Sequence, residues 1–332
     1  MTSRRQRFGN QSFRNLVKKF NDVGLVFTDD QFRLQDQSLF QTTQFRHKLD
    51  VGKPLWKRPK EILELKDSKL DKTKNPNKPF EPVLLPEKWT TDDFASFFCF
   101  KGPNQWFITA GLALALHRSL LKKVIQDDNN NFFKTGIVKF NIWISGRFQK
   151  VVVDDKLPVD QSSDDLIFIR PYGLKSHAFW LPLLEKAYSK LYGSYEAMFN
   201  QGSLESVLID LTAGGVVNTI HQLDSSLHLE MFVKEYYAKS LIILKSIDFG
   251  TKANLLGLQS NRYYLIKQIK KTASSGTLKK LSSKSFQTDH GLSGSFPQIS
   301  VLVINTIFDT SKPTSSGNSS FNFVVPKLQE VM

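Results

Sequence analysis

Cysteine is almost absent from this chain, which has one thiol, Cys99, among 332 residues. A single thiol cannot form an internal disulfide, a four-cysteine zinc site or an iron–sulfur centre, so packing must hold the fold together. The six histidines show no i, i+4 pairing and no cysteine at ligand spacing, which gives a zinc site little support. This composition is typical of a reducing compartment, and we expect a cytoplasmic protein.

Long hydrophobic runs and phosphate-binding loops are also lacking. The longest apolar stretch, 106–116, is interrupted by Thr109 and falls well short of the ~20 residues that a bilayer needs, so no membrane span is expected. Residues 1–20 contain six Lys and Arg and no apolar run, which excludes a secretory signal peptide. No glycine-rich nucleotide loop and no EF-hand loop are present, which argues against both functions.

Positive charge, by contrast, is abundant. The chain carries 45 Lys and Arg against 31 Asp and Glu, a net charge of +14. Such an excess attracts nucleic acid, anionic lipid or an acidic protein surface without saying which. The 27 phenylalanines are dispersed, so core packing explains them better than stacking on nucleic acid. We therefore disfavour nucleic acid, while the basic loops leave a microtubule or another anionic surface open.

The hydrophobic pattern predicts a chain of mixed helices and strands. We expect a buried helix of about six turns from Asn104 and a strand hairpin that turns at Ser145 and Gly146. A second buried helix carries Pro182 in its first turn, where proline costs little. Polar segments are predicted as exposed loops. The expected helices are 13–20, 104–126, 179–191 and 227–238, the strands 136–146, 148–154, 241–247, 263–269 and 299–304, and the loops 66–82 and 270–295.

Several segments together resemble the catalytic core of the calpain family of papain-like cysteine proteases. The most specific are the strings VVVDDKLP and LLEKAYSKLYGSYEA. The segments that carry the resemblance are 56–62, 136–158, 179–190, 193–197 and 211–215. In order and spacing the resemblance covers roughly residues 20–308.

The resemblance implies an α+β fold, a papain-like two-lobe cysteine protease core. It predicts a helical N-terminal lobe and an antiparallel-sheet C-terminal lobe that is truncated here. The implied domains are an N-terminal arm at 1–50, the first lobe at 51–215, the second lobe at 216–308 and a flexible tail at 309–332. The second lobe would carry the basic, serine-rich insertion 270–295.

The resemblance also implies that the active site is degenerate. The family begins its buried helix with a nucleophilic cysteine in a G-D-C-W motif, and here the aligned residues place Gln105 at the cysteine. Arg262 stands where the family has its histidine base, and only Asn305 matches the orienting asparagine. An amide cannot form an acyl-enzyme, and a guanidinium with a pKa above ~12 cannot accept the nucleophile's proton. The family's oxyanion-stabilising glutamine has no counterpart at 98–101.

Calcium ligands are expected to be lost as well. Calpain cores bind calcium in each lobe, and the resemblance places Ala178 where the family carries a ligating glutamate. The family's second acidic ligand would fall within 95–97, and these residues offer no carboxylate. We therefore expect no cofactor. The paired Asp154 and Asp155 are predicted to form a structural, salt-bridged loop near Arg147 and Lys156 rather than a catalytic acid–base pair.

These residues predict a catalytically inactive calpain-like pseudoprotease that acts through protein binding or regulation. The alternative is an active, calcium-dependent cysteine endopeptidase in which Cys99 is a relocated nucleophile. The phenylalanines that flank Cys99 favour a small, inert core residue instead. Two further alternatives are a basic adaptor for an anionic polymer and a chain whose second lobe does not fold stably.

Overall fold

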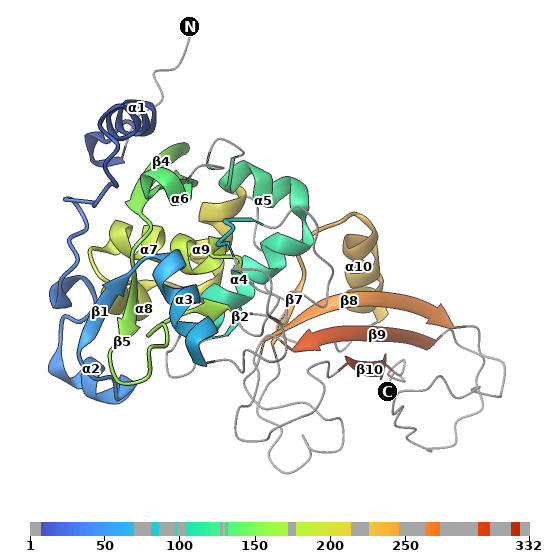
Figure 1. Cartoon of the computed structure of the whole chain (residues 1–332). Helices are drawn as coiled ribbons and strands as arrows, with labels where there is room; N and C mark the ends of the chain where they lie inside the picture. Colours follow the sequence, from blue (N-terminus) through green and yellow to red (C-terminus); the bar gives the residue numbers. More distant parts are fainter. Residues whose placement is uncertain are drawn as a thin grey trace, which may run out of the picture. The chain divides into compact units, whose positions relative to one another are not determined.

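The protein was analysed as a computed structural model (Figure 1). The structure describes residues 8–69, 81–85, 97–98, 104–126, 129, 132–171, 177–213, 226–245, 263–272, 298–305 and 320–325. The chain divides into two compact units, Met1–Val217 and Asn218–Met332. Within the described residues, no helix has the length and apolar character needed to cross a bilayer.

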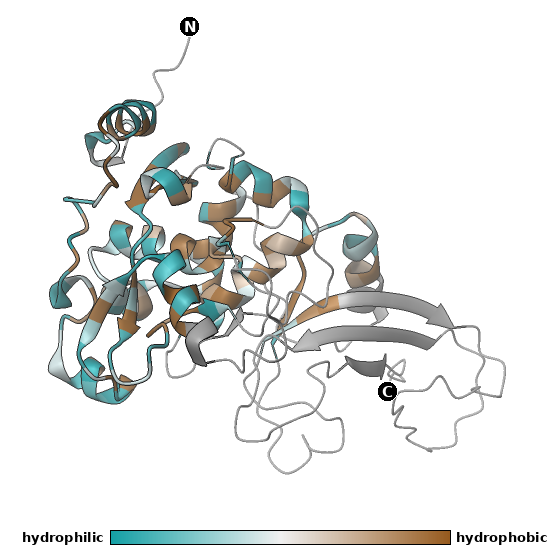
Figure 2. Ribbon diagram, viewed as in Figure 1, coloured by the Kyte–Doolittle hydropathy of each residue, from teal (hydrophilic) through white to brown (hydrophobic). Residues whose placement is uncertain are grey.

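The first unit is built around two buried helices. Helix α4 (Gln105–Leu116) is apolar on almost every face, and α7 (Trp180–Tyr192) buries all but its last two residues. Apolar residues dominate α4 in Figure 2. The prediction of one six-turn helix over 104–126 is wrong at one point, because the chain leaves helical geometry at His117 and continues as α5 (Arg118–Val124).

Two further helices, α8 (Tyr195–Gln201) and α9 (Leu204–Thr212), complete this helical layer. Helix α8 packs on α7, and α9 packs on α4 and on the first strand of a hairpin. Their beginnings follow from capping chemistry. Ser194 accepts a hydrogen bond from the backbone N–H of Ala197, and Ser203 forms a reciprocal capping box with Ser206.

The predicted hairpin is confirmed as β3 (Ile137–Ile144) and β4 (Arg147–Asp154). Ser145 and Gly146 form its turn, both with positive φ (51° and 77°), which suits the right-handed twist of the strands. Two small antiparallel sheets lie in the same unit. They pair β1 (Pro54–Lys57) with β5 (Leu157–Asp160), and β2 (Phe97–Phe98) with β6 (Arg170–Pro171).

The N-terminal segment packs onto this body. Helix α1 begins after Ser12, which accepts a hydrogen bond from Asn15 N–H, and ends at Gly24 in left-handed geometry. Phe13 and Phe27 join Ile137 of β3 in one buried cluster. The remaining elements of this unit are η1 (Phe8–Asn10), α1 (Phe13–Val23), η2 (Asp36–Ser38), α2 (Thr43–Leu49), α3 (Pro59–Lys69) and α6 (Phe132–Thr135).

Parts of three segments that were predicted as loops or as a tail belong to a helix or a strand. Helix α3 runs to Lys69, so the loop predicted from residue 66 is wrong for four residues, through which the helix that begins at Pro59 continues. Residues 70–80 lie outside the described residues. Lys270–Thr272 belong to a strand, and 273–295 lie outside. The predicted tail contains β10 (Ser320–Val325), whose two phenylalanines and two valines favour a strand.

The second unit contains α10 (Ser226–Tyr237) and an antiparallel sheet, in agreement with the helix predicted at 227–238 and the strands predicted after it. Its strand order is β10-β9-β8-β7, and a bulge interrupts β8 between Ile266 and Gln268. The other strands are β7 (Ile243–Lys245), β8 (Tyr263–Thr272) and β9 (Gln298–Asn305). The chain is therefore of mixed α+β class.

Candidate functional site

The start of α4 is the position that the resemblance assigns to the nucleophile. Gln105 is the first residue of the helix and is half-buried, while Trp106 behind it is buried. The Trp106 ring contacts Phe107 edge-on at a centroid distance of 5.6 Å and Tyr188 of α7 at 6.5 Å. Thr109 donates its hydroxyl to the Gln105 carbonyl at 2.7 Å. This packing fixes which side chain begins the helix.

Close helix packing holds this end of α4 in place. A Cβ on Gly111 would lie 2.4 Å from Leu181 Cδ1 of α7, so a larger residue at this position would force the Leu181 side chain to move. A Cβ on Gly202 would lie 2.4 Å from the Trp106 ring. Both glycines are needed for close approach rather than for unusual backbone geometry.

Asn104 and Glu185 form a buried pair immediately before Gln105. Asn104 donates Nδ2–H to Glu185 Oε1 at 2.8 Å, and Ile169 donates its backbone N–H to Glu185 Oε2 at 3.0 Å. Both side chains are buried. Asn104 Oδ1 has no hydrogen-bond partner among the residues that the structure describes. The contact joins residues 81 positions apart, and sequence reasoning missed it, although a glutamate within the apolar run of α7 was a signal.

Burial shifts the acidity of Glu185 strongly. Loss of hydration raises the pKa of its carboxyl from 4.5 to about 8, while the hydrogen bonds from Asn104 and Ile169 act in the opposite direction. The side chain is therefore mostly neutral at pH 7. A neutral carboxyl has a hydroxyl to donate, and rotation of the Asn104 amide brings Oδ1 to the same position as an acceptor.

A second buried network surrounds the paired aspartates. Asp154 Oδ1 accepts from Lys186 Nζ at 2.7 Å, and its Oδ2 accepts from the Asp29 backbone N–H at 2.8 Å. Asp155 pairs with Arg58. The predicted structural role is confirmed, but the predicted partners are wrong. Lys156 contributes its backbone N–H and carbonyl rather than its ammonium group, and Arg147 lies at the opposite end of β4.

The same network ties the N-terminal segment to α7. Lys190 Nζ donates to Asp29 Oδ2 at 2.6 Å, to Gln11 Oε1 at 2.8 Å and to the Val152 carbonyl at 2.8 Å. Burial lowers the pKa of Lys190, and the neighbouring Asp29 opposes that shift. Each buried charge here has a partner, which is the condition for tolerating it.

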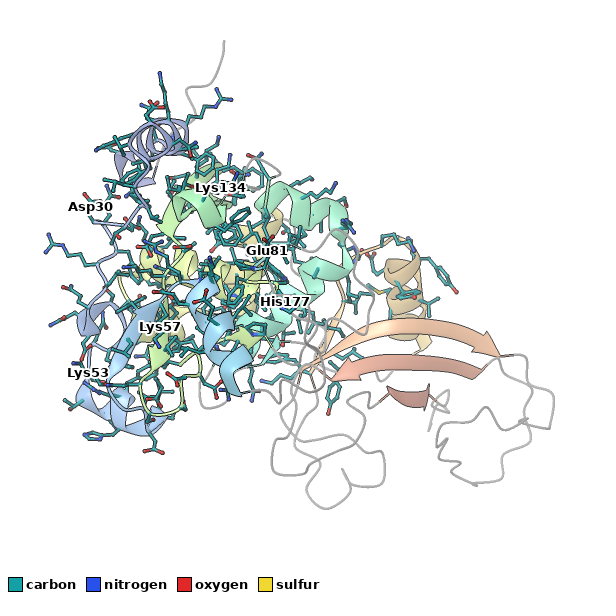
Figure 3. The ribbon with its side chains drawn as sticks, in the orientation of Figure 1. Asp30, Lys53, Lys57, Glu81, Lys134 and His177 are labelled. Carbon is teal, nitrogen blue, oxygen red and sulfur yellow. The ribbon has the colours of Figure 1, made fainter. Side chains whose placement is uncertain are left out.

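Ala178 stands at the position where the resemblance expects a calcium ligand of the family to be lost. Ala178, which follows the labelled His177 in Figure 3, is buried and forms an isolated parallel bridge with Val83. Its methyl group offers no oxygen, so the side chain at this position cannot ligate calcium. Over the described ranges, no three His, Cys, Asp or Glu side chains gather in a way that could hold a metal. Residues 95 and 96, where the family's second acidic calcium ligand would fall, lie outside the described residues.

The remaining predicted site residues fall mostly outside the described part of the chain. Cys99 and Arg262 are not among the described residues. Asn305 is the last residue of β9, and its backbone pairs with Tyr264 of β8. The register thus places Asn305 opposite a residue two positions after Arg262. Gln105 belongs to the first unit, and Asn305 to the second.

The first unit contains a buried helix that starts next to the buried Trp106, and the second unit, later in the sequence, contains an antiparallel sheet. This agrees with the two-lobe arrangement that the resemblance to papain-like cysteine proteases implies. A family model described as calpain family cysteine protease matches residues 27–283. The chain therefore belongs to the calpain family, and membership implies the papain-like fold. The match ends before Asn305, so the assignment of that residue depends on strand 298–305.

Curated relatives agree with this assignment. Calpain-12 of Homo sapiens is 30% identical over 243 residues, which cover 72% of this chain and 30% of the relative. Calpain-5 of Caenorhabditis elegans is 31% identical over 261 residues, 75% of this chain and 36% of the relative. Calpain-13 of Rattus norvegicus is 31% identical over 234 residues, 69% and 30% respectively. The chain spans about a third of the length of these relatives.

Proposed function

We propose that this chain is a catalytically inactive calpain-type core that acts by binding another protein. The observation that carries the proposal is that Gln105 begins α4 directly before the buried Trp106. The family resemblance assigns that place to the nucleophilic cysteine. A shift of one residue along the helix would move the indole out of its contact with Tyr188 of α7, so packing opposes such a shift.

The chemistry of the assigned residues supports inactivity. A glutamine amide has neither thiolate nor hydroxyl with which to attack a peptide carbonyl. Arg262 keeps its proton at every physiological pH and cannot act as the base. A peptide could still bind beside the α4 N-terminus without being cut. The bound chain would be a substrate or a partner of an active relative, and retention without cleavage would be the regulatory action.

Hydrolysis of fluorescently labelled casein tests the loss of activity. The purified protein is assayed with millimolar calcium and with chelator, beside a Cys99→Ser variant. We expect no turnover in any condition. Turnover that disappears in Cys99→Ser would contradict the proposal and identify Cys99 as a relocated nucleophile. Turnover that is equal in both proteins and survives calcium removal would indicate a contaminating protease.

Thiol labelling tests the assignment of Gln105 and Arg262 without relying on activity. In a Cys99→Ser background, Gln105→Cys and the double variant Gln105→Cys/Arg262→His are treated with iodoacetamide at neutral pH. If the resemblance assigns both positions correctly, the double variant should react faster, because the family's histidine raises the thiolate fraction of its cysteine. Equal rates, with both variants folded, would show that position 262 does not face position 105.

Casein anisotropy tests the binding half of the proposal. Labelled casein is titrated with the wild type, with Gln105→Trp and with a control, Gln201→Trp, at an exposed residue at the end of α8. We expect saturable binding that Gln105→Trp weakens and Gln201→Trp leaves unchanged. Equal binding by all three proteins would exclude the α4 N-terminus as the binding place.

A further inference from the structure

Four large apolar side chains stand exposed at one corner of the first unit. We call Val23, Leu25, Val26 and Phe133 the apolar corner. Their exposed fractions are 55%, 63%, 44% and 48%. Single exposed leucines are common on proteins, but a contiguous apolar group with a polar rim marks an interaction site.

Backbone contacts bring the two parts of the apolar corner together. Phe27 donates its backbone N–H to the Thr135 carbonyl at 2.8 Å, which fixes the segment after α1 against α6. Helices α1 and α6 are also in contact. A Cβ on Gly136 would lie 2.6 Å from Val26 Cγ1, so Val26 lies next to the end of α6. The left-handed Gly24 reverses the chain, so that Leu25 follows directly at the end of α1.

Positive charge borders the apolar corner. The apolar face of α1 packs into the core through Phe13, and its solvent face carries exposed Arg14, Lys18 and Lys19. Lys134, labelled in Figure 3, is exposed beside Phe133 on α6. Residues 1–23 contain six Lys and Arg and a single acid, Asp22. The corner thus combines protruding apolar tips with a basic rim.

We propose that the apolar corner inserts into the interface of an anionic lipid bilayer while Lys18, Lys19 and Lys134 contact the headgroups. Apolar tips gain by entering the boundary between headgroups and acyl chains, and each juxtamembrane lysine gains from the negative surface potential. The exposed side chains come from the end of α1, the two residues after Gly24 and the short helix α6, which the hydrogen bond from Phe27 to Thr135 holds together. The inference stands independently of the proposed pseudoprotease role.

Vesicle co-sedimentation tests the proposal on the full chain. The probes are vesicles of phosphatidylcholine alone and vesicles that contain about one-third phosphatidylserine. We expect binding only to the second, weakening as salt rises. Lys18→Glu/Lys19→Glu should bind at least about 25-fold more weakly, from about fivefold for each lysine lost. Leu25→Ser/Val26→Ser should bind about 10-fold more weakly, because its apolar tips no longer enter the interface.

Matched controls separate this corner from general effects. Lys53→Glu/Lys60→Glu makes the same change in net charge at exposed residues on other elements, and Ile209→Ser removes an exposed apolar side chain from α9. We expect both to bind like the wild type. Thermal unfolding of every variant checks that it folds.

Three results would overturn the proposal. The first is equal binding to both kinds of vesicle, and the second is equal weakening by the corner variants and their controls. The third is no vesicle binding together with binding to a polyglutamate peptide that Lys18→Glu/Lys19→Glu abolishes. That result would assign the corner to an acidic protein surface instead.

Discussion

Glu185 is a buried acid whose protonation state is set by its neighbours. Two N–H groups, from Asn104 and Ile169, point at its two oxygens, yet loss of hydration outweighs them and keeps the carboxyl neutral at pH 7. Rotation of the Asn104 amide would give the carboxyl hydroxyl an acceptor. The residue next to the assigned nucleophile position is thus coupled to a titrating group.

The pH dependence of stability should report on Glu185. Its pKa is about 8 in the fold against an ordinary 4.5, so between these values the folded state holds a proton that the unfolded state has lost. The free energy of unfolding therefore falls as pH rises through this window, by at most about 5 kcal/mol. Glu185→Gln should remove the part of this slope that Glu185 contributes, since its amide can donate to Asn104 Oδ1. Urea unfolding across the window measures the effect.

The control for this prediction is Glu205→Gln, at an exposed position in the first turn of α9. It should keep the wild-type pH slope. A Glu185→Gln protein with an unchanged slope would show that Glu185 is ionised in the folded state across this range.

The buried pair of Lys186 and Asp154 should be costly to break. Lys186 Nζ also donates to the Lys156 carbonyl at 2.6 Å, and neither charged side chain reaches water. Lys186→Met leaves the Asp154 carboxylate buried without its cation, which should cost about 3–5 kcal/mol of unfolding free energy. Chemical denaturation measures the loss.

Two further variants make this prediction specific. Adding Asp154→Asn to Lys186→Met should restore part of the stability, because the buried charge is removed. Arg46→Ala breaks an exposed ion pair with Asp36 and should cost at most about 1 kcal/mol. Equal losses of unfolding free energy in Lys186→Met and Arg46→Ala would show that burial does not determine how much an ion pair costs to break.

At this scale the sequence could predict roles better than partners. The pairing of Asp154 and Asp155 with positive charges was foreseeable from local composition. Their actual partners, Lys186 and Arg58, come from elements distant in the chain, and only the packed fold brings them together. Asn104 was recognisable as the residue before a helix, whereas its bond to Glu185 depends on how α4 meets α7.

Elements with strong periodicity were predictable, and their interruptions were not. The hairpin at Ser145 and Gly146 and the start of α7 at Trp180 follow from turn chemistry and from an apolar run with an early proline. The break at His117 leaves no comparable signal, because alanine and leucine before it and lysine after it all favour helix. Tertiary packing on β3 and α9 decides where α5 turns away.

The contact of α8 with α4 should not tolerate a methyl group at Gly202. The Gly202 backbone is extended (φ −80°), so alanine is allowed conformationally at this position. The alanine Cβ, however, would lie 2.4 Å from the Trp106 ring and 2.8 Å from the Met198 carbonyl oxygen. Gly202→Ala should therefore cost about 1–3 kcal/mol and shift the tryptophan emission as Trp106 moves. Thermal unfolding and fluorescence measure both effects.

Gly52→Ala is the control for this contact. The atom nearest to its Cβ is the tip of the Asp160 side chain at 3.0 Å, which can move aside. Its cost should be less than half that of Gly202→Ala. If Gly202→Ala leaves stability and emission unchanged, the α4 N-terminus is held less tightly than its packing implies.

At the scale of the whole molecule, order along the chain was the most predictive feature. The strings VVVDDKLP and LLEKAYSKLYGSYEA and their order carried the resemblance to the calpain family, and residues 27–283 match the model of that family. Lobe boundaries are harder to predict, because they depend on which elements pack together. The domain boundaries stay a prediction, and contacts divide the chain between Val217 and Asn218.

The first unit should fold without the second. It contains α4, α7, both buried polar networks and the β3–β4 hairpin, so its core is complete within 1–217. A fragment 1–217 should unfold in one cooperative transition by circular dichroism. A fragment 1–193 lacks α8 and α9, which cover α7 and α4, and should not fold. If 1–217 melted without a cooperative transition while the full chain unfolded cooperatively, the second unit would be needed to stabilise the first, and any binding of a partner by the first unit would require both units.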